Sequence, residues 1–400
     1  MHETPLTGLV LGGGGARAAY QVGVLRAIAR LRRDTRVSAR RSPFGVICGT
    51  SAGAINAAAL ACGADHFDHS VEAIAQVWQD FRAEHVYRVD SWGLARGGAR
   101  WLAMVSLGWL RPRSRKARPH SLLDNSPLAE LLARAVPMER LPRMLAGRHV
   151  QALALSASSY TAGVHVSFYQ AAAPLPPWVR AQRMAVAAEL GTAHLLASSA
   201  IPFVFPATEL PIHGQPQWFG DGSMRQTAPL SPAIHLGAQR LVVIGAGRVQ
   251  HPAVHRVDST GYPSLAQIAG HSLSSIFLDA LTADVERLQR INRTLALLSD
   301  EARAATPLHP INALVITPSQ RLDDIAARHV RDLPATVRGL LRAVGVRSNG
   351  HGAQGAALAS YLLFESGYTR ELMALGEQDV LSRRDEVLGF FGWPAAAPRA

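Results

Sequence analysis

The chain has 400 residues, of which 48% are hydrophobic and 18% are charged, which is typical of a globular protein and excludes a disordered or fibrous one. The formal net charge is +12, and Lys116 is the only lysine, so arginine carries nearly all of the positive charge. Such a protein is attracted to anionic surfaces, either phospholipid headgroups or nucleic acids, and charge alone does not choose between them.

Cysteine usage and the amino terminus bear on the cellular compartment. Cys48 and Cys62 form no CxxC or zinc-like spacing, so we interpret them as small buried residues in a reducing compartment. The start of the chain, MHETPLTGLVLGGGG, lacks a cationic segment followed by a long apolar one, so no signal peptide is expected. No stretch approaches the roughly 20 apolar residues that span a bilayer. We therefore expect a cytoplasmic protein.

The first predicted elements repeat one pattern. A short strand at 9–11 runs into four glycines at 12–15, and apolar residues then recur at helical spacing over 16–32. A second strand at 44–48 leads through a tight turn into a helix at 52–61. Strand, tight loop and helix, twice in succession, predict βαβ units and an α/β fold with a mainly parallel sheet.

The rest of the chain is predicted more coarsely. Short apolar runs indicate strands at 153–156, 164–169, 241–244 and 313–316, and the first two are joined by SSYTAG as neighbours. Residues 189–199 predict a helix that ends before Pro202. After residue 264 helices dominate.

The turn after the second strand carries the clearest chemical signal. Its sequence, GTSAG, places Ser51 between Gly49 and Gly53 at a strand-to-helix junction, as in a nucleophile elbow. Flanking glycines let the neighbouring backbone pass, and the helix beginning at Ala52 directs its amino-terminal amides toward the serine oxygen. A helix-capping serine is the structural alternative.

A nucleophilic serine needs a base, and the sequence offers two kinds. There are 16 histidines, none of them in a local signature. The second kind is Asp221, in WFGDGS. Asp-Gly by itself is an ordinary turn, but the preceding aromatic residues indicate a strand end, which would place Asp221 at the same sheet edge as Ser51.

Three functions can be considered for the glycine-rich loop: dinucleotide binding, phosphate binding and oxyanion binding. Residues 13–18 match a loose dinucleotide-binding fingerprint, but the next strand ends in Cys48 and Gly49 without the required carboxylate. A phosphate-binding Walker loop requires a lysine that is missing. The remaining interpretation is that successive glycine amides donate hydrogen bonds to an oxyanion.

Together, GGGGARAAYQVGVL, GTSAG, ASSAIPFVFPA and DGS resemble the patatin-like phospholipases, in that family's order, over about residues 8–245. The resemblance implies a Ser-Asp dyad without histidine, metal or cofactor, acting on fatty acyl esters of (phospho)lipids through an acyl-enzyme. Carried over motif by motif, it implies Ser51 as nucleophile, Asp221 as its partner, and the amides of Gly13, Gly14 and Gly15 as oxyanion hole. From the residues themselves we interpret Gly49 and Gly53 as elbow residues and Gly222 as a supporting residue. Arg17 either holds the glycine loop, which we favour, or neutralises charge. Ala18 and Ser223 depart from the family's usual glycine or alanine.

The same resemblance shapes the expected architecture. It implies a three-layer α/β sandwich with a central, mostly parallel sheet. We expect residues 8–245 to form the catalytic domain and residues 246–400 a mainly helical region that is possibly continuous with the same fold.

Two alternatives to the dyad enzyme stay open. One is an esterase with a Ser-His-Asp triad, and the other is a catalytically weak lipid-binding or regulatory protein whose arginines do the main work. Residues 100–118, RWLAMVSLGWLRPRSRKAR, suit a peripheral anchor on an anionic membrane, or equally a core helix followed by a solvated loop. No nucleic-acid-binding motif accompanies the charge, so no nucleic-acid partner is expected.

Overall fold

The computed structural model describes residues 5–37, 42–88, 121–247, 262–346 and 355–394. A ten-stranded sheet runs through its centre in the order β10-β9-β1-β2-β3-β4-β6-β5, with β8 paired to β3 and β7 paired to β8. The strands are β1 (Thr7–Leu11), β2 (Val46–Thr50), β3 (Ala152–Ser159), β4 (His165–Ala171), β5 (Val179–Arg180), β6 (Arg183–Ala187), β7 (Thr208–Ile212), β8 (Gln215–Asp221), β9 (Arg240–Ile244) and β10 (Asn312–Ile316).

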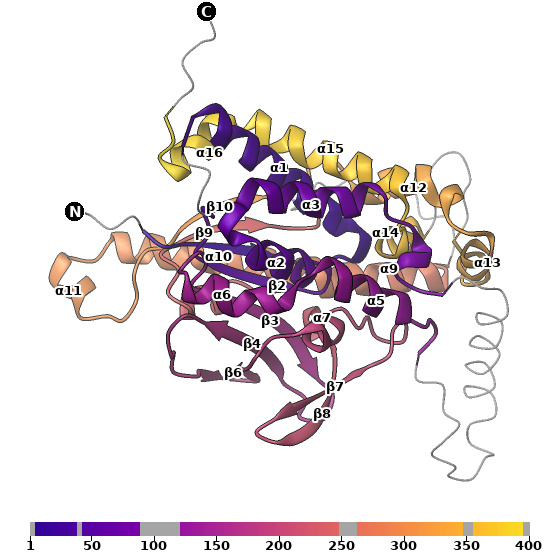
Figure 1. Ribbon diagram of the computed structural model, residues 1–400, viewed down its shortest axis with the longest axis horizontal. Coiled ribbons are helices and arrows are strands. Elements are labelled where there is room, and N and C mark those ends of the chain that lie inside the picture. The colour runs from indigo at the N-terminus through magenta and orange to yellow at the C-terminus, as the bar shows by residue number, and fades with distance from the viewer. Residues whose placement is uncertain (1–4, 38–41, 89–120, 248–261, 347–354, 395–400) are drawn as a thin grey trace, which may run out of the picture.

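Helices flank this sheet (Figure 1). They are α1 (Ala19–Asp34), α2 (Ala52–Cys62), α3 (Phe67–Gln79), α5 (Ser126–Ala135), α6 (Leu141–Ala146), α7 (Thr192–Ser198), α8 (Ser231–His235), α9 (Leu265–Ser274), α10 (Ala280–Ala296), α11 (Asp300–Ala304), α12 (Leu322–His329), α13 (Ala335–Ala343), α14 (Ala356–Leu362), α15 (Ser366–Ser382) and α16 (Arg384–Phe391).

The sheet is mostly parallel. Strands β10, β9, β1, β2 and β3 pair in parallel from one neighbour to the next, and β4 pairs in parallel with β6. The antiparallel pairs are β3 with β4, β3 with β8, β7 with β8, and β5 with β6. The predicted α/β fold with a central, mostly parallel sheet is therefore confirmed.

The two faces of the sheet bury two separate cores. Leu9, Leu11 and Ile47 belong to the core shared with α1, α2 and α3, whereas Val10 and Cys48 belong to the core shared with α8 and α10. Successive side chains of a strand point to opposite faces, so a strand covered on both faces is apolar throughout. This explains why the central strands read as continuous apolar runs, and it gives the molecule three layers.

Two predicted helices differ from the observed ones at their ends. The helix predicted from residue 16 begins at Ala19, because Gly15–Ala18 form a 3₁₀ turn. The helix predicted over 189–199 is confined to α7, because the backbone is extended at Gly191, with φ −147° and ψ −178°, and the helix starts only after it. The predicted strands are all present, with ends shifted by a few residues.

Elements from the last third of the chain pack directly on the first third. Strand β10 extends the sheet beside β9, and α15 lies along α1 (Figure 1). The Tyr20 hydroxyl of α1 donates a buried hydrogen bond of 2.9 Å to Asp379 Oδ2 of α15. The division into residues 8–245 and 246–400 stays a prediction.

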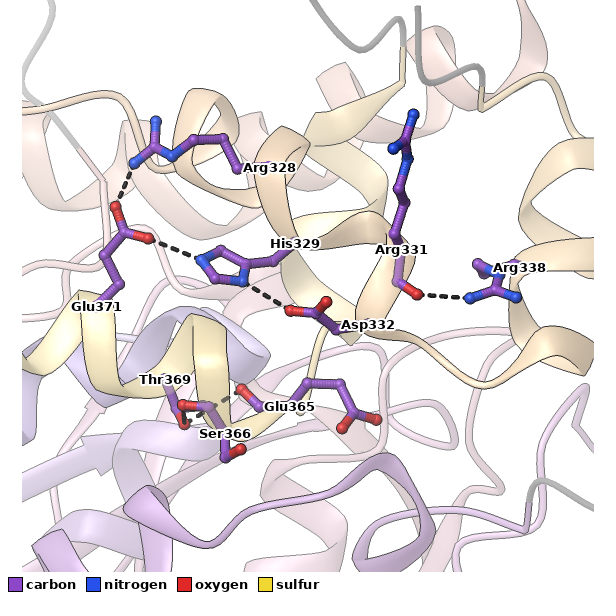
Figure 2. Close-up of polar contacts among 9 residues, drawn as sticks. All are labelled: Arg328, His329, Arg331, Asp332, Arg338, Glu365, Ser366, Thr369 and Glu371. Atoms are coloured by element: carbon purple, nitrogen blue, oxygen red, sulfur yellow. Dashed lines mark hydrogen bonds and ion pairs between the residues drawn. The ribbon is translucent and has the colours of Figure 1, made fainter. Parts of the chain in front are cut away.

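A polar cluster at the end of α12 joins that helix to α15. Figure 2 shows His329 between Glu371 and Asp332, with ring nitrogens 2.7 Å and 2.8 Å from the two carboxylates, and Arg328 paired with Glu371. Because the carboxylates are partly exposed, the cluster orients the two helices more than it stabilises them.

No helix in the described ranges is both long enough and apolar enough to cross a bilayer. Residues 100–118 lie outside the described residues, so their predicted contact with an anionic membrane stays a prediction.

The packing of α1 on α15 gives the first testable prediction. A Cβ atom at Gly23 would lie 2.0 Å from Met373 O, so we expect Gly23→Ala to lower the free energy of unfolding by about 1–3 kcal/mol or more. At Gly389, a helical glycine of α16, an added Cβ meets nothing within 4 Å. Gly389→Ala should therefore raise stability by about 0.5–1 kcal/mol. Urea denaturation measures both, and equal effects of the two variants would contradict this packing.

Candidate active site

Strands β2 and β8 meet end to end beside β3. Thr50, the last residue of β2, pairs with Ser156, and Asp221, the last residue of β8, pairs with Ala157. Strand β4 occupies the opposite edge of β3, where Val166 pairs with Ala157, so β2 and β8 share one edge. Since β2 runs parallel and β8 antiparallel to β3, their carboxyl ends face each other. The structure thereby brings Ser51 and Asp221 together.

Ser51 sits in a strained turn. It is buried, with φ 57° and ψ −131°, a conformation that costs a non-glycine residue about 1–3 kcal/mol. Its amide donates to Ser198 Oγ at 2.9 Å. Two residues later, a Cβ at Gly53 would lie 2.4 Å from Gly12 O, so only glycine lets α2 start against the glycine loop. Gly49, within β2, packs against the Gly53 backbone.

Asp221 is completely buried and only half satisfied. Its exposed fraction is 0%, and Oδ1 accepts a hydrogen bond of 2.9 Å from the Ser223 amide. Oδ2 has no hydrogen-bond partner among the residues that the structure describes. A carboxylate oxygen in this state is costly to bury, which makes it a candidate for a functional role.

Burial raises the pKa of Asp221 to about 6, and the hydroxyl of Ser51 and the amide of Ser223 counteract part of this effect. The Ser51 hydroxyl is therefore close enough to influence the carboxylate, although its geometry falls short of a hydrogen bond to Oδ2. Such bonds are often long in free enzymes and shorten when substrate binds.

The glycine loop leaves three amides available. Gly12 donates its amide to Ile244 O at 3.2 Å, and Arg17 donates its amide to Gly14 O at 3.1 Å. Within the described part of the chain, the amides of Gly13, Gly14 and Gly15 donate to no backbone carbonyl. Gly15 lines a cavity together with Ser51, and Gly13 packs against Ser223. The arrangement can hold an oxyanion beside the Ser51 hydroxyl.

The Arg17 side chain is directed toward the helices of the last third of the chain. Its Nε donates to Ser360 Oγ at 2.8 Å, its guanidinium pairs with Asp323, and it lies 4.0 Å from the centre of the Tyr361 ring. These contacts fix the glycine loop to α14 and α12. Gly222 opens the 3₁₀ turn after Asp221 and lies against the β3 backbone.

A cavity of 410 Å³ extends from Ser51 between α2, α3 and α5. Apolar side chains from these helices and from the chain after α7 line most of it: Ile55 and Ala59 of α2, Ile74, Val77 and Trp78 of α3, Leu128, Leu131 and Leu132 of α5, and Ile201 and Phe205. Its size and lining suit a flexible apolar ligand such as an acyl chain.

No histidine in the described ranges forms a hydrogen bond with Ser51 or Asp221. His165 of β4 interacts with the backbone of Gly222, the residue after Asp221, and burial lowers the pKa of His165 to about 4. A search of the same residues finds no group of three or more His, Cys, Asp or Glu side chains placed to hold a metal ion.

Two contacts at the site escaped the sequence motifs. The Ser198 hydroxyl accepts a hydrogen bond from the Ser51 amide. Ser198 lies within the ASSAIPFVFPA motif, so the sequence marked this segment but did not indicate the role of Ser198. Gln226 donates to Thr50 Oγ1 at 2.9 Å and to Ser156 Oγ at 3.2 Å, tying the ends of β2 and β3 together. No local pattern marks that glutamine, because its partners are set by strand pairing.

Comparison with protein families matches residues 9–234, more than half of the chain, to the patatin-like phospholipase description. The chain belongs to the patatin-like phospholipase family. The match includes the glycine loop, Ser51 and Asp221. As a member of that family, the chain is a lipid acyl hydrolase.

The chain is also distantly similar to several solved structures, among them the following two. VipD from Legionella pneumophila is 12% identical, with 93% of this chain and 67% of that chain covered and a TM-score of 0.30. ExoU from Pseudomonas aeruginosa, solved in complex with SpcU, is 15% identical, with 95% and 74% covered and a TM-score of 0.26. No curated protein matches the chain.

The burial of Asp221 in this patatin-like phospholipase predicts a pH-dependent stability. The folded pKa lies above the unfolded value, so the folded state holds the proton more tightly, and the free energy of unfolding falls as pH rises from about 4 to about 6. Asp221→Asn removes the charge. We expect it to be more stable than the wild type by about 1–3 kcal/mol near pH 8, and by much less near pH 4.

Chemical denaturation at both pH values measures this difference. Asp300, whose side chain is 95% exposed, offers a matched control, because Asp300→Asn is the same chemical change at a carboxylate that is not buried. A stability difference for Asp221→Asn that does not change with pH would contradict the buried, proton-binding carboxyl.

Proposed function

We propose that this chain hydrolyses fatty acyl ester bonds of (phospho)lipids through a Ser51-Asp221 dyad and an acyl-enzyme. The observation that carries the proposal is the strained Ser51 turn beside a fully buried carboxylate whose Oδ2 has no other partner in the described part of the chain. Strain and an unsatisfied buried oxygen both cost stability, and both cluster at functional sites.

Acylation starts when the Ser51 hydroxyl gives its proton to Asp221 Oδ2 as its oxygen attacks the ester carbonyl carbon. The carbonyl oxygen becomes an oxyanion, which the amides of Gly13, Gly14 and Gly15 stabilise. When this tetrahedral intermediate collapses, the bond to the alcohol breaks and Asp221 returns the proton to the leaving oxygen. The acyl group remains on Ser51 as an ester.

Deacylation repeats these steps with water. Asp221 takes a proton from the water while the water oxygen attacks the acyl carbon. The same glycine amides hold the second oxyanion. Collapse breaks the bond to Ser51 Oγ, which regains its proton from Asp221, and the fatty acid leaves. One carboxylate therefore serves as base and acid in both halves.

An aspartate is a weak base, so the site has to compensate. Burial raises the pKa of Asp221 to about 6, which brings it nearer the operating pH while leaving it mostly ionised at neutral pH. The glycine amides supply the larger effect, because losing one such donor typically raises the activation free energy by about 3–4 kcal/mol. Oxyanion binding thus outweighs base strength.

The substrate class follows from the cavity beside Ser51. Its 410 Å³ are lined mainly by aliphatic and aromatic side chains of α2, α3 and α5, where a fatty acyl chain would be removed from water. The net charge of +12 favours lipid aggregates with an anionic surface. We infer that the acyl chain enters this cavity and that the headgroup remains outside it.

The dyad predicts a severe loss of turnover from two substitutions that keep the fold. Ser51→Ala and Asp221→Asn should each lower kcat for a chromogenic acyl ester by about 10³-fold or more, because each removes a reacting group. Circular dichroism should show unchanged folding. Ser272→Ala, which truncates an exposed serine of α9, is the matched control and should keep wild-type activity.

The same assay separates the alternatives. Ordinary activity in Asp221→Asn, with loss of activity in a histidine variant such as His165→Asn, would replace the dyad by a triad. A fluorophosphonate probe that fails to label the wild-type protein at Ser51 in the presence of any lipid would favour a lipid-binding protein over an enzyme.

A further inference from the structure

Gly12, which starts the glycine loop, is held through both of its backbone polar groups, and these belong to two successive peptide units. The Gly12 amide donates to Ile244 O at 3.2 Å, and the Gly12 carbonyl accepts a hydrogen bond of 2.7 Å from Gln21 Nε2. In a trans peptide the carbonyl and the following N–H point in opposite directions within one plane. The contact that holds the Gly12 carbonyl therefore also aims the amide of Gly13.

Gln21 is the first member of a buried chain of hydrogen bonds that crosses three helices. Its Oε1 accepts from Asn56 Nδ2 of α2 at 3.2 Å, and Asn56 Nδ2 also donates to Ala18 O at 3.3 Å. Asn56 Oδ1 accepts from Trp78 Nε1 of α3 at 2.9 Å. All three side chains are buried.

The donor and acceptor directions in this series of hydrogen bonds are fixed by the groups at its two ends. An indole N–H only donates and a backbone carbonyl only accepts, so both amide side chains have a single possible orientation. Asn56 turns its oxygen to Trp78, and Gln21 consequently turns its nitrogen to Gly12. Flipping either side-chain amide would leave buried donors and acceptors without partners, which would lower the stability of the folded state.

Packing holds the members in place. The Trp78 ring stacks on Phe81, with centres 4.9 Å apart and planes 17° from parallel. On the other side, the start of α2 at Gly53 lies against Gly12 O so closely that no side chain fits between them. These contacts hold the Trp78 end and the Gly12 end of the hydrogen-bond network in place.

We propose that Gln21, Asn56 and Trp78 form a positioning relay that fixes the Gly12–Gly13 peptide for oxyanion binding. None of the three acts on the substrate's reacting atoms, so they are positioning residues. The catalytic benefit of the relay rests on the proposed function, whereas its effect on the loop does not.

Amide hydrogen exchange tests the effect on the loop independently of turnover. Gln21→Met keeps the side-chain length and removes both hydrogen bonds, so exchange in a peptide covering residues 12–18 should accelerate about tenfold or more. Tyr20→Phe is the matched control, since it removes an equally buried bond of the neighbouring residue to Asp379, away from the loop. Equal exchange in the wild type and Gln21→Met would overturn the relay.

Kinetics with a chromogenic acyl ester test its catalytic use. For Gln21→Met we expect kcat to fall about 10- to 100-fold with KM changed less than about twofold, because misaligned donors weaken transition-state binding selectively. Trp78→Phe keeps an aromatic ring but removes the far N–H together with part of a ring that lines the cavity, so its readout is exchange, which should accelerate by less than in Gln21→Met. If kcat falls as much in Tyr20→Phe, the relay has no special role.

Different results would contradict the proposed acyl hydrolase function and the proposed relay. If the wild-type protein neither hydrolyses the ester nor reacts with a fluorophosphonate at Ser51, the proposed function is wrong. Faster exchange in Gln21→Met but not in Tyr20→Phe would still support the relay as the device that orders the glycine loop.

Discussion

The head-on meeting of β2 and β8 along one edge of β3 is the constraint on which the site depends. Strand pairing places Thr50, the last residue of β2, beside Ser156, and Asp221, the last residue of β8, beside Ala157. Ser51 directly follows Thr50, so it lies at the point where the end of β8 places Asp221. The glycine loop closes the third side, because Gly12 O touches the start of α2 at Gly53. The proposed nucleophile, the carboxylate and the loop amides are thus brought together by backbone geometry.

This arrangement costs stability, and the surrounding layers offset the cost. Ser51 holds an unfavourable backbone conformation, and Asp221 is buried with one oxygen unpaired in the described structure. Both are held by apolar cores on the two faces of the sheet and by α15, which packs on α1. The last third of the chain contributes directly, since Arg17 ties the glycine loop to α14 and α12.

Short-range signals in the sequence were enough to predict the α/β fold, because apolar runs followed by glycine-rich turns mark parallel strands locally. GTSAG and DGS also marked Ser51 and Asp221 as candidates, since each motif records a local backbone demand. The polar side chains that support the backbone around the site were not predictable in this way. Gln226, Ser198 and the Gln21-Asn56 pair act across strands and helices that only tertiary packing brings together.

The most direct test of the central claim is a crystal structure of the protein after reaction with a fluorophosphonate. The account predicts phosphorus bonded to Ser51 Oγ, a phosphonyl oxygen about 2.7–3.1 Å from amides of the Gly13–Gly15 loop, and the Asp221 carboxylate beside Oγ. An adduct on another residue, or a phosphonyl oxygen directed away from the glycine loop with Asp221 remote from Ser51, would contradict it.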